Sequence, residues 1–235
     1  CVISVVVPFY NPNPQEAKET LKSLHTHLKS NNEKFEIIAV NDGSTNDSGA
    51  QLEQLAKKLS DENGSFNILT HEENKGKGAA LTTGFVQSKG KWVGFVDADG
   101  DISPKQVLIY LQLAKKHNAD MVAGSKLHPE STVERKNQRN IVSKLLQQFN
   151  KRILRLEILD TQVGIKVINR KMLAAVLPKM YESTFAFDLE MFVIAKEQGH
   201  TSMLIGVNRG TEMGSLFNHE LSGAGSVSYL LGHLY

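Results

Sequence analysis

Short apolar runs alternate along this chain with longer stretches in which apolar residues recur every three or four positions. The runs are rich in β-branched residues and predict strands at residues 2–7, 35–40, 66–69, 92–96, 120–124 and 163–168. The stretches between them predict helices, and the first carries one stripe of Ala17, Leu21, Leu24 and Leu28. Strands that alternate with helices at this spacing predict an α/β fold, in which helices flank a mostly parallel central sheet.

The unusual polar residues follow the ends of these strands. We expect the first strand to stop at Pro8, because proline has no N–H for the sheet, and a cluster of small polar residues at 41–47 follows the second strand. Open parallel sheets bind their ligands beyond the carboxyl ends of the strands. The pattern therefore predicts a ligand site at this edge of the sheet.

Three carboxylates end the strand predicted at residues 92–96. Asp97, Asp99 and Asp101 stand at alternate positions, which point to the same side of an extended backbone. Clustered carboxylates repel one another, and a hard divalent cation such as Mg²⁺ or Mn²⁺ relieves that repulsion while substrate phosphates complete its shell. The alternative is an acidic turn before the next helix, with Ser103 as N-cap and Pro104 at its first position.

The composition is that of an ordinary globular chain: 235 residues, 40% hydrophobic and 22% charged, long enough for one large domain or two small ones. The formal net charge of +2 does not indicate a nucleic-acid partner. A single cysteine, Cys1, excludes an internal disulfide framework, and no apolar run reaches the roughly 18 to 20 residues of a membrane span. Because the chain opens inside a strand-like run, we expect it to be part of a longer protein.

Positive charge is concentrated between residues 126 and 155, where eight lysines and arginines accompany two glutamates. Most of this charge lies on a predicted helix whose other side is apolar, with Ile141, Leu145, Leu146, Phe149 and Ile153. One interpretation is a solvated helix face. The other is a surface that meets phosphates or an anionic membrane.

Six motifs, taken together and in this order, resemble family 2 glycosyltransferases of the GT-A fold, and most of all the polyprenyl-phosphate (dolichyl-phosphate) sugar transferases. They occupy residues 6–11, 41–45, 74–79, 97–101, 160–162 with Gly164 and Lys166, and 187–190. The resemblance covers residues 2–207. It implies one GT-A domain over residues 1–235, with a nucleotide-sugar-binding half at 1–101 and an acceptor-binding half at 102–235.

The resemblance also implies roles for individual residues. The nucleotide sugar would be held by Pro8, Tyr10, Asn11, Asp42, Ser44, Lys77, Asp97 and Ala98. Asp97 and Asp99 would bind the metal on its diphosphate, and Asp101 stands where some relatives have a glutamine that also touches the metal. The acceptor phosphate would meet Lys126, Arg135 and Arg139.

Two departures from the family pattern change details of these expectations. Pro12 follows Asn11 where acidic residues are usual, and Lys126 replaces an arginine, which exchanges a bidentate fork for a point charge. Gly76 and Gly78 either bring Lys77 close to phosphates or ease helix–sheet packing. Their spacing fits neither a P-loop nor a dinucleotide fingerprint.

The acceptor decides whether a general base is needed. A sugar hydroxyl must lose a proton during attack, whereas a phosphate monoester, with a second pKa near ~6, is already largely ionised at neutral pH. Asp188 and Asp160 are the candidate catalytic carboxylates; their alternatives are a helix cap and a turn former. The histidines at 25, 27, 71, 117 and 128 lack ligand spacing and are interpreted as surface residues, while His219 is a late candidate for the metal.

We therefore expect an inverting, Mg²⁺- or Mn²⁺-dependent enzyme that moves a hexose from a nucleotide sugar to a polyprenyl phosphate. A UDP-sugar is favoured as donor, with GDP-mannose as the other possibility. Such an enzyme would work at the cytoplasmic face of a membrane. The alternatives are transfer to a sugar hydroxyl in glycan synthesis, and a nucleotide-sugar-binding module without catalysis, against which the intact carboxylate cluster argues.

Overall fold

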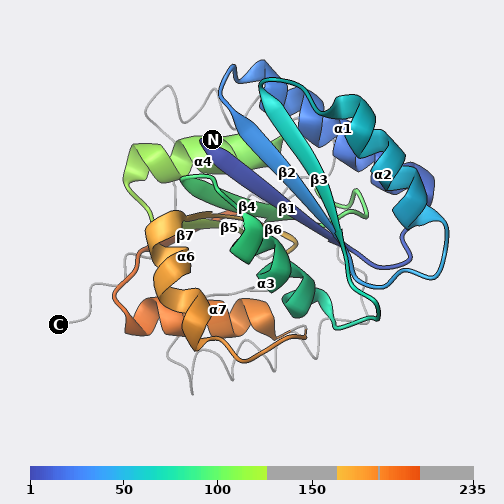
Figure 1. Ribbon diagram of the computed structural model, residues 1–235. Coiled ribbons are helices and arrows are strands. Elements are labelled where there is room, and N and C mark those ends of the chain that lie inside the picture. Colours follow the sequence, from blue (N-terminus) through green and yellow to red (C-terminus); the bar gives the residue numbers. More distant parts are fainter. Residues whose placement is uncertain (126–162, 185, 207–235) are drawn as a thin grey trace.

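The computed structural model describes residues 1–125, 163–184 and 186–206, which form one seven-stranded sheet flanked by helices (Figure 1). The strands lie in the order β3-β2-β1-β4-β6-β5-β7. Their bounds are β1 Ile3–Phe9, β2 Phe35–Asn41, β3 Gly64–Thr70, β4 Trp92–Val96, β5 Met121–Ser125, β6 Ile165–Asn169 and β7 Ser202–Gly206. Only β6, which is antiparallel to both β4 and β5, breaks the parallel arrangement of these strands.

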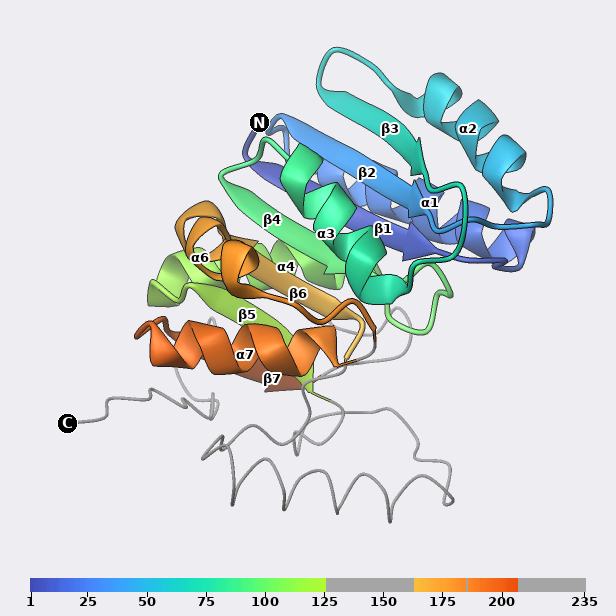
Figure 2. The same cartoon turned by 60° about the horizontal axis from the view of Figure 1, so that its bottom comes forward.

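Helices cover both faces of the sheet (Figures 1 and 2). They are α1 Pro14–Ser30, α2 Ser48–Leu59, α3 Lys77–Gln87, α4 Gln106–His117, α6 Arg170–Val176, the short 3₁₀ helix η2 Leu177–Lys179, and α7 Phe187–Glu197. The first core contains residues of α1, α2 and α4, and the second contains residues of α3, α6 and α7. Within β1, Val5 and Val7 belong to the first core and Val6 to the second. Burial of both faces explains why β1, β2 and β4 are mostly apolar runs, whereas the partly exposed β3 carries polar residues.

The predicted fold class, a mostly parallel α/β sheet flanked by helices, is confirmed, but two boundaries differ. β1 continues through Pro8 to Phe9, because beyond Val6 it pairs only with β2 and needs no N–H on its other side. The interpretation of Ser103 as N-cap was wrong: α4 begins at Gln106 without a side-chain cap, and the Gln106 N–H donates to the Ser103 carbonyl oxygen (3.1 Å). Within the described residues, no helix is both long and apolar enough to cross a membrane.

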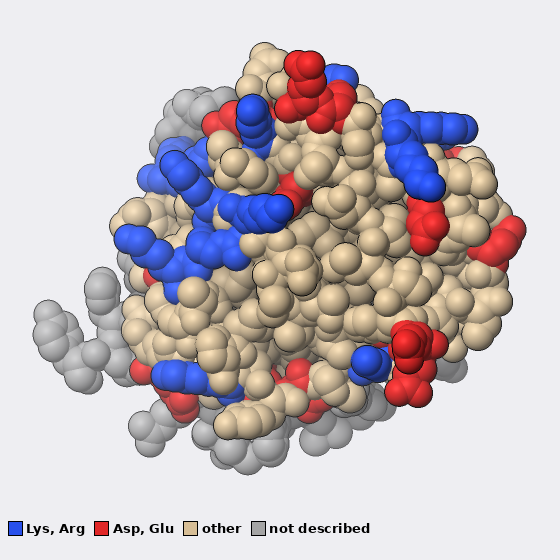
Figure 3. Space-filling view, viewed as in Figure 1, with Lys and Arg blue, Asp and Glu red and all other residues tan. Residues whose placement is uncertain are grey.

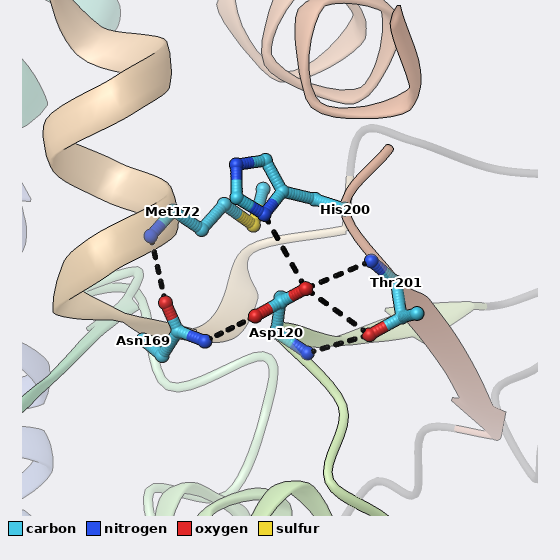
Figure 4. A network of polar contacts seen from close by, with 5 residues as sticks. All are labelled: Asp120, Asn169, Met172, His200 and Thr201. Atoms are coloured by element: carbon cyan, nitrogen blue, oxygen red, sulfur yellow. Dashed lines mark hydrogen bonds and ion pairs between the residues drawn. The ribbon is translucent and has the colours of Figure 1, made fainter. Parts of the chain in front are cut away.

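Asp120 joins three elements at the amino edge of the parallel strands (Figure 4). Its Oδ2 accepts hydrogen bonds from Thr201 N (3.0 Å) and Thr201 Oγ1 (3.2 Å), and His200 Nδ1 lies 3.3 Å away. Its Oδ1 accepts a hydrogen bond from Asn169, whose own Oδ1 caps α6 at Met172 N (2.7 Å). Asp120 thus connects the start of β5 with α6 and β7.

We expect Asp120→Asn to lower the free energy of unfolding by about 1–3 kcal/mol, because it removes a charged acceptor from this network. Burial raises the pKa of the Asp120 carboxyl, but hydrogen bonds from Thr201, Asn169 and His200 outweigh it and hold the pKa below its ordinary value. The carboxylate therefore stabilises the fold above its unfolded-state pKa, and this contribution is lost as the pH falls through the lower folded-state pKa. Urea unfolding of both proteins at pH 7 and pH 3 measures this; an equal difference at both pH values would contradict it.

Candidate functional site

A cleft of about 350 Å³ opens at the carboxyl ends of β1, β2 and β4. The strand order turns at β1, because β2 and β3 lie on one side of it and β4 on the other. Such a switch point is where open α/β sheets bind ligands. The cleft is lined by Pro8, Phe9, Tyr10, Pro12, Asp42, Asn74, Gly76, Lys77, Ala80, Asp97, Ala98 and Asp99. Six of the eight residues predicted to bind a nucleotide sugar are therefore brought together here.

Asn11 and Ser44, the other two, join the loops that follow β1 and β2 instead of lining the cleft. Asn11 Oδ1 accepts hydrogen bonds from Thr45 N (2.8 Å) and Asn46 N (3.2 Å), and Asn11 N donates to Ser44 Oγ (2.9 Å). Asn11 has a φ of 44°, a left-handed conformation that asparagine tolerates better than most residues. The two residues thus fix the shape of the cleft wall.

Asp42 is a buried carboxylate, 3% exposed, held by a network of donors. Oδ1 accepts hydrogen bonds from Lys75 N (2.9 Å) and lies 2.7 Å from His71 Nδ1, and Oδ2 accepts from Gly76 N (2.9 Å). His71 Nε2 lies 2.9 Å from Thr83 Oγ1 on α3. Oδ2 can still accept a hydrogen bond from a ligand N–H, and these donors fix the orientation of the carboxylate.

The interpretation of His71 as a surface residue was wrong, because its side chain is only 10% exposed and contacts Asp42. The same correction applies to His25, which is 6% exposed. The partner of His71 lies 29 positions earlier in the chain, so no local spacing could have identified the pair.

We expect His71→Leu to weaken binding of a nucleoside diphosphate about tenfold, which corresponds to the ~1.4 kcal/mol of one lost hydrogen bond to a charged group. Calorimetric titration with UDP and GDP measures the change. Thr83→Val is the matched control: it removes only the contact at the far ring nitrogen and should have a smaller effect. Unchanged nucleotide affinity in His71→Leu would show that the histidine does not orient Asp42.

Lys77 and Asp97, which also line the cleft, form an ion pair with Nζ 2.6 Å from Oδ1 and 2.8 Å from Oδ2. About one third of each side chain is exposed, 35% for Lys77 and 29% for Asp97. The Asp97 N–H donates to the Gly164 carbonyl oxygen (3.0 Å). A Cβ atom on Gly164 would stand 1.9 Å from Asp97 Oδ2, so the carboxylate can lie in this position only beside glycine.

The expected alternation of carboxylates does not continue past Asp97. β4 ends at Val96, and the following segment turns, with Gly100 at a φ of 73° and Asp99 Oδ1 accepting a hydrogen bond from Asp101 N (3.0 Å). Asp99 lines the cleft with Asp97, whereas Asp101 does not. Among the described residues, no three histidine, cysteine, aspartate or glutamate side chains form a group that could hold a metal ion.

The residues present fit a divalent metal that takes part of its shell from a ligand. Asp97 and Asp99 offer oxygen donors to the cleft, the ligand type that Mg²⁺ and Mn²⁺ prefer. Magnesium is usually held by one or two carboxylates together with substrate phosphates and water, so a third carboxylate is not required. Asp97 and Asp99 are therefore the residues that would hold the metal.

Gly76 and Gly78 allow a neighbouring loop to approach the start of α3. A Cβ atom on Gly76 would stand 2.8 Å from the Ser183 carbonyl oxygen, and one on Gly78 would stand 2.7 Å from the same atom. That oxygen accepts a hydrogen bond from Ala79 N (3.1 Å). The glycines thus serve close packing, while Lys77 between them faces the cleft.

Asp188, a predicted catalytic carboxylate, lies in the first turn of α7, 5% exposed, and is not a cleft residue. Its Oδ1 lies 3.0 Å from Nζ of Lys166, a fully buried residue of β6. Burial lowers the pKa of the Lys166 ammonium, and Asp188 opposes that shift. Two residues later, Glu190 accepts hydrogen bonds from the N–H groups of Tyr181 and Glu182 and so fixes the loop that contacts α3.

Several predicted site residues lie outside the described part of the chain: Lys126, Arg135, Arg139, Asp160 and His219. Ser125, which precedes Lys126, and Val163, three residues after Asp160, lie at the cleft edge of the sheet, because β5 ends at Ser125 and β6 begins at Ile165. Figure 3 shows lysines and arginines gathered over the end of α4 and the start of α6. Lys115 and Lys116 stand in the last turn of α4 and Lys171 in the first turn of α6, and these helix ends lie at the opposite edge of the sheet from the cleft.

A cleft at the switch point, lined by a fixed carboxylate and by a lysine with two further acidic residues, is typical of α/β proteins that bind nucleotides. Residues 4–177 match Glycosyl transferase family 2, and the chain belongs to this family. It is 28% identical over 205 residues to a dolichyl-phosphate beta-glucosyltransferase of Dictyostelium discoideum, and 30% identical over 208 residues to one of Trichomonas vaginalis. Each alignment covers 83% of this chain and 62% of the relative, so the chain spans less than two thirds of these proteins.

Solved structures of glycosyltransferases share the fold. Glucosyl-3-phosphoglycerate synthase from Mycobacterium tuberculosis, in complex with UDP, has a TM-score of 0.62 at 16% identity, over 92% of this chain and 74% of that one. A mannosyltransferase from Pyrobaculum calidifontis, in complex with GDP-Man and Mn²⁺, has a TM-score of 0.60 at 16% identity, over 90% and 58%. The sheet described above is thus the GT-A fold, as expected from the sequence.

Proposed function

We propose that this domain moves a hexose, with inversion, from a nucleotide sugar to the phosphate of a polyprenyl or dolichyl lipid. Two relatives that the chain resembles over 83% of its length are named dolichyl-phosphate beta-glucosyltransferases, which favours glucose from a UDP-sugar over mannose from GDP-mannose. The observation that carries the proposal is the cleft, because one surface presents both Asp42 and the Asp97 and Asp99 pair.

The residues of the cleft fit a division of roles along the donor. Asp42 Oδ2 would accept an N–H of the base, since backbone and histidine donors already fix that carboxylate. Lys77 would lie against the diphosphate and stabilise the charge that develops as the sugar–phosphate bond breaks. A Mg²⁺ or Mn²⁺ ion at Asp97 and Asp99 would supply Lewis-acid stabilisation of the same leaving group.

A site for a phosphate acceptor needs positive charge to bind the phosphate more than it needs a general base to deprotonate it. Its phosphate oxygen is ionised at neutral pH and attacks the anomeric carbon from the side opposite the leaving nucleotide, which inverts that carbon. The basic residues predicted to hold this phosphate, Lys126, Arg135 and Arg139, lie outside the described residues and follow Ser125, the last residue of β5, at the cleft edge of the sheet. A lipid acceptor would place the domain at a membrane surface, on the cytoplasmic face in this proposal.

A donor screen tests the proposal. The protein is mixed with UDP-glucose, other UDP-hexoses or GDP-mannose and with Mg²⁺ or Mn²⁺, and nucleoside diphosphate release is measured with and without a short polyprenyl phosphate. We expect release from one donor that needs both lipid and metal. Release that needs a sugar hydroxyl acceptor would favour glycan synthesis, and nucleotide-sugar binding without any release would favour a binding module.

A further inference from the structure

The ion pair between Lys166 and Asp188 is buried beside the cleft and linked to it by contacts. The Lys166 ammonium lies 3.0 Å from Asp188 Oδ1 and donates a hydrogen bond to the Val163 carbonyl oxygen (3.0 Å). It also lies 4.9 Å from the centre of the Phe95 ring, and the ammonium of the cleft residue Lys77 lies 5.6 Å from the same ring. Lys77 in turn pairs with Asp97.

Stability alone explains such a pair poorly. Two buried charges lose their hydration, and replacing them together by apolar residues of similar volume is often neutral or stabilising. A fully buried lysine that also binds a backbone carbonyl therefore suggests that the shape of the backbone matters. The carbonyl that it binds belongs to Val163, which directly precedes Gly164.

Asp97 packs directly against Gly164. The glycine carbonyl oxygen accepts the Asp97 N–H (3.0 Å), and the lack of a side chain makes room for Asp97 Oδ2. The contacts thus form a continuous chain from Asp188 through Lys166 and the Val163 carbonyl to Asp97.

We propose that Lys166 and Asp188 are positioning residues: they hold the Val163–Gly164 backbone in the conformation that binds the Asp97 N–H and leaves room for the Asp97 carboxylate. Asp188 is then not the base of the reaction. Asp188 is 5% exposed and is not a cleft residue, which leaves it no direct access to an acceptor there. The inference deepens the proposed function, since it rests on Asp97 serving the metal and donor.

The test combines an apolar replacement of the pair with a substitution of one partner. In Lys166→Met/Asp188→Leu, we expect the melting temperature to stay near that of the wild type, because no buried charge is left unpaired. Hydrogen exchange at the Asp97 amide should nevertheless become at least tenfold faster, and the affinity for UDP in the presence of Mn²⁺ should fall at least tenfold by calorimetry. Wild-type exchange and affinity in this stable variant would overturn the proposal.

If the double variant does not fold, Asp188→Asn is the second variant for the same test, because asparagine keeps the shape of the side chain. We expect weaker Mn²⁺–UDP binding and faster exchange at the Asp97 amide. Lost turnover with wild-type Mn²⁺–UDP affinity would instead identify Asp188 as a base and overturn the proposal. Asp120→Asn is the control for general destabilisation: its melting temperature should fall while Mn²⁺–UDP affinity stays unchanged. If wild-type protein binds no nucleotide, the proposed function fails, and the exchange measurement still decides the role of the pair.

Discussion

Asp99→Asn is expected to lower turnover by about 100-fold or more while the protein stays folded. A carboxylate that holds the metal on the diphosphate contributes several kcal/mol to leaving-group stabilisation, and asparagine lacks the charge. The fold should survive, because the asparagine oxygen can still accept the Asp101 N–H that Asp99 Oδ1 accepts in the wild type. Steady-state kinetics with saturating donor, together with a melting curve, measures both effects.

Asp101→Asn provides the matched control, since Asp101 lies two residues further along the same turn and does not line the cleft. We expect this variant to keep most of its turnover and its dependence on metal concentration. Equal losses in the two variants would mean that Asp101 also serves the metal, as the sequence predicts. Wild-type turnover in Asp99→Asn would remove Asp99 from the metal site.

Arg139→Ala is expected to harm use of the acceptor far more than binding of the donor. Arg139 lies outside the described residues, and the family resemblance assigns it to the acceptor phosphate. Loss of a charge-assisted hydrogen bond in a partly desolvated site costs about 1.5–3 kcal/mol, roughly ten- to 150-fold in acceptor kcat/KM. Kinetics with varied polyprenyl phosphate, and calorimetry with UDP, separate the two steps.

Asp42→Ala should show the reverse pattern, with nucleotide affinity reduced and acceptor KM nearly unchanged, because Asp42 lines the donor cleft and is fixed by its backbone donors. The contrast between the two variants is the informative result. If Arg139→Ala weakened UDP or GDP binding and left acceptor kinetics unchanged, the arginine would belong to the donor site. The proposal of a phosphate acceptor would then lose its main residue-level support.

The fold was largely predictable because its strands are buried on both faces. The apolar runs at residues 35–40 and 92–96 lie within β2 and β4. A strand that is buried on both faces is mostly apolar along its whole length, so it can be recognised as a single run. α6 and β7 were not predicted. α6 has only seven residues, about two turns, which is too short to give a periodic signal.

The site was predictable where its residues directly follow strands, as Asp42 follows β2 and Asp97 follows β4. Contacts between distant segments were not predictable. Asn11 reaches Thr45 and Asn46, His71 reaches Asp42, and Lys166 reaches Asp188, and each pairing depends on the packing of loops or helices that local sequence does not encode. Asp97 and Asp99 both line the cleft, as expected, but Asp101 does not, because the extended backbone on which that expectation relied ends at Val96.

The antiparallel placement of β6 beside β5 has a consequence for how such proteins diversify. Ala123 pairs with Lys166 in register, so the chain leaves the sheet after Ser125 and returns at Val163 at nearly the same place. When the two ends of a connection are held side by side, as Ser125 and Val163 are here, its length can change with little loss of folding stability. Each doubling of a flexible loop adds only ~0.6 kcal/mol to the entropic free energy of closing it. Since the resemblance assigns the acceptor phosphate to Lys126, Arg135 and Arg139, we expect that replacing residues 126–162 with the corresponding stretch of a relative that uses another acceptor changes the acceptor and keeps the donor.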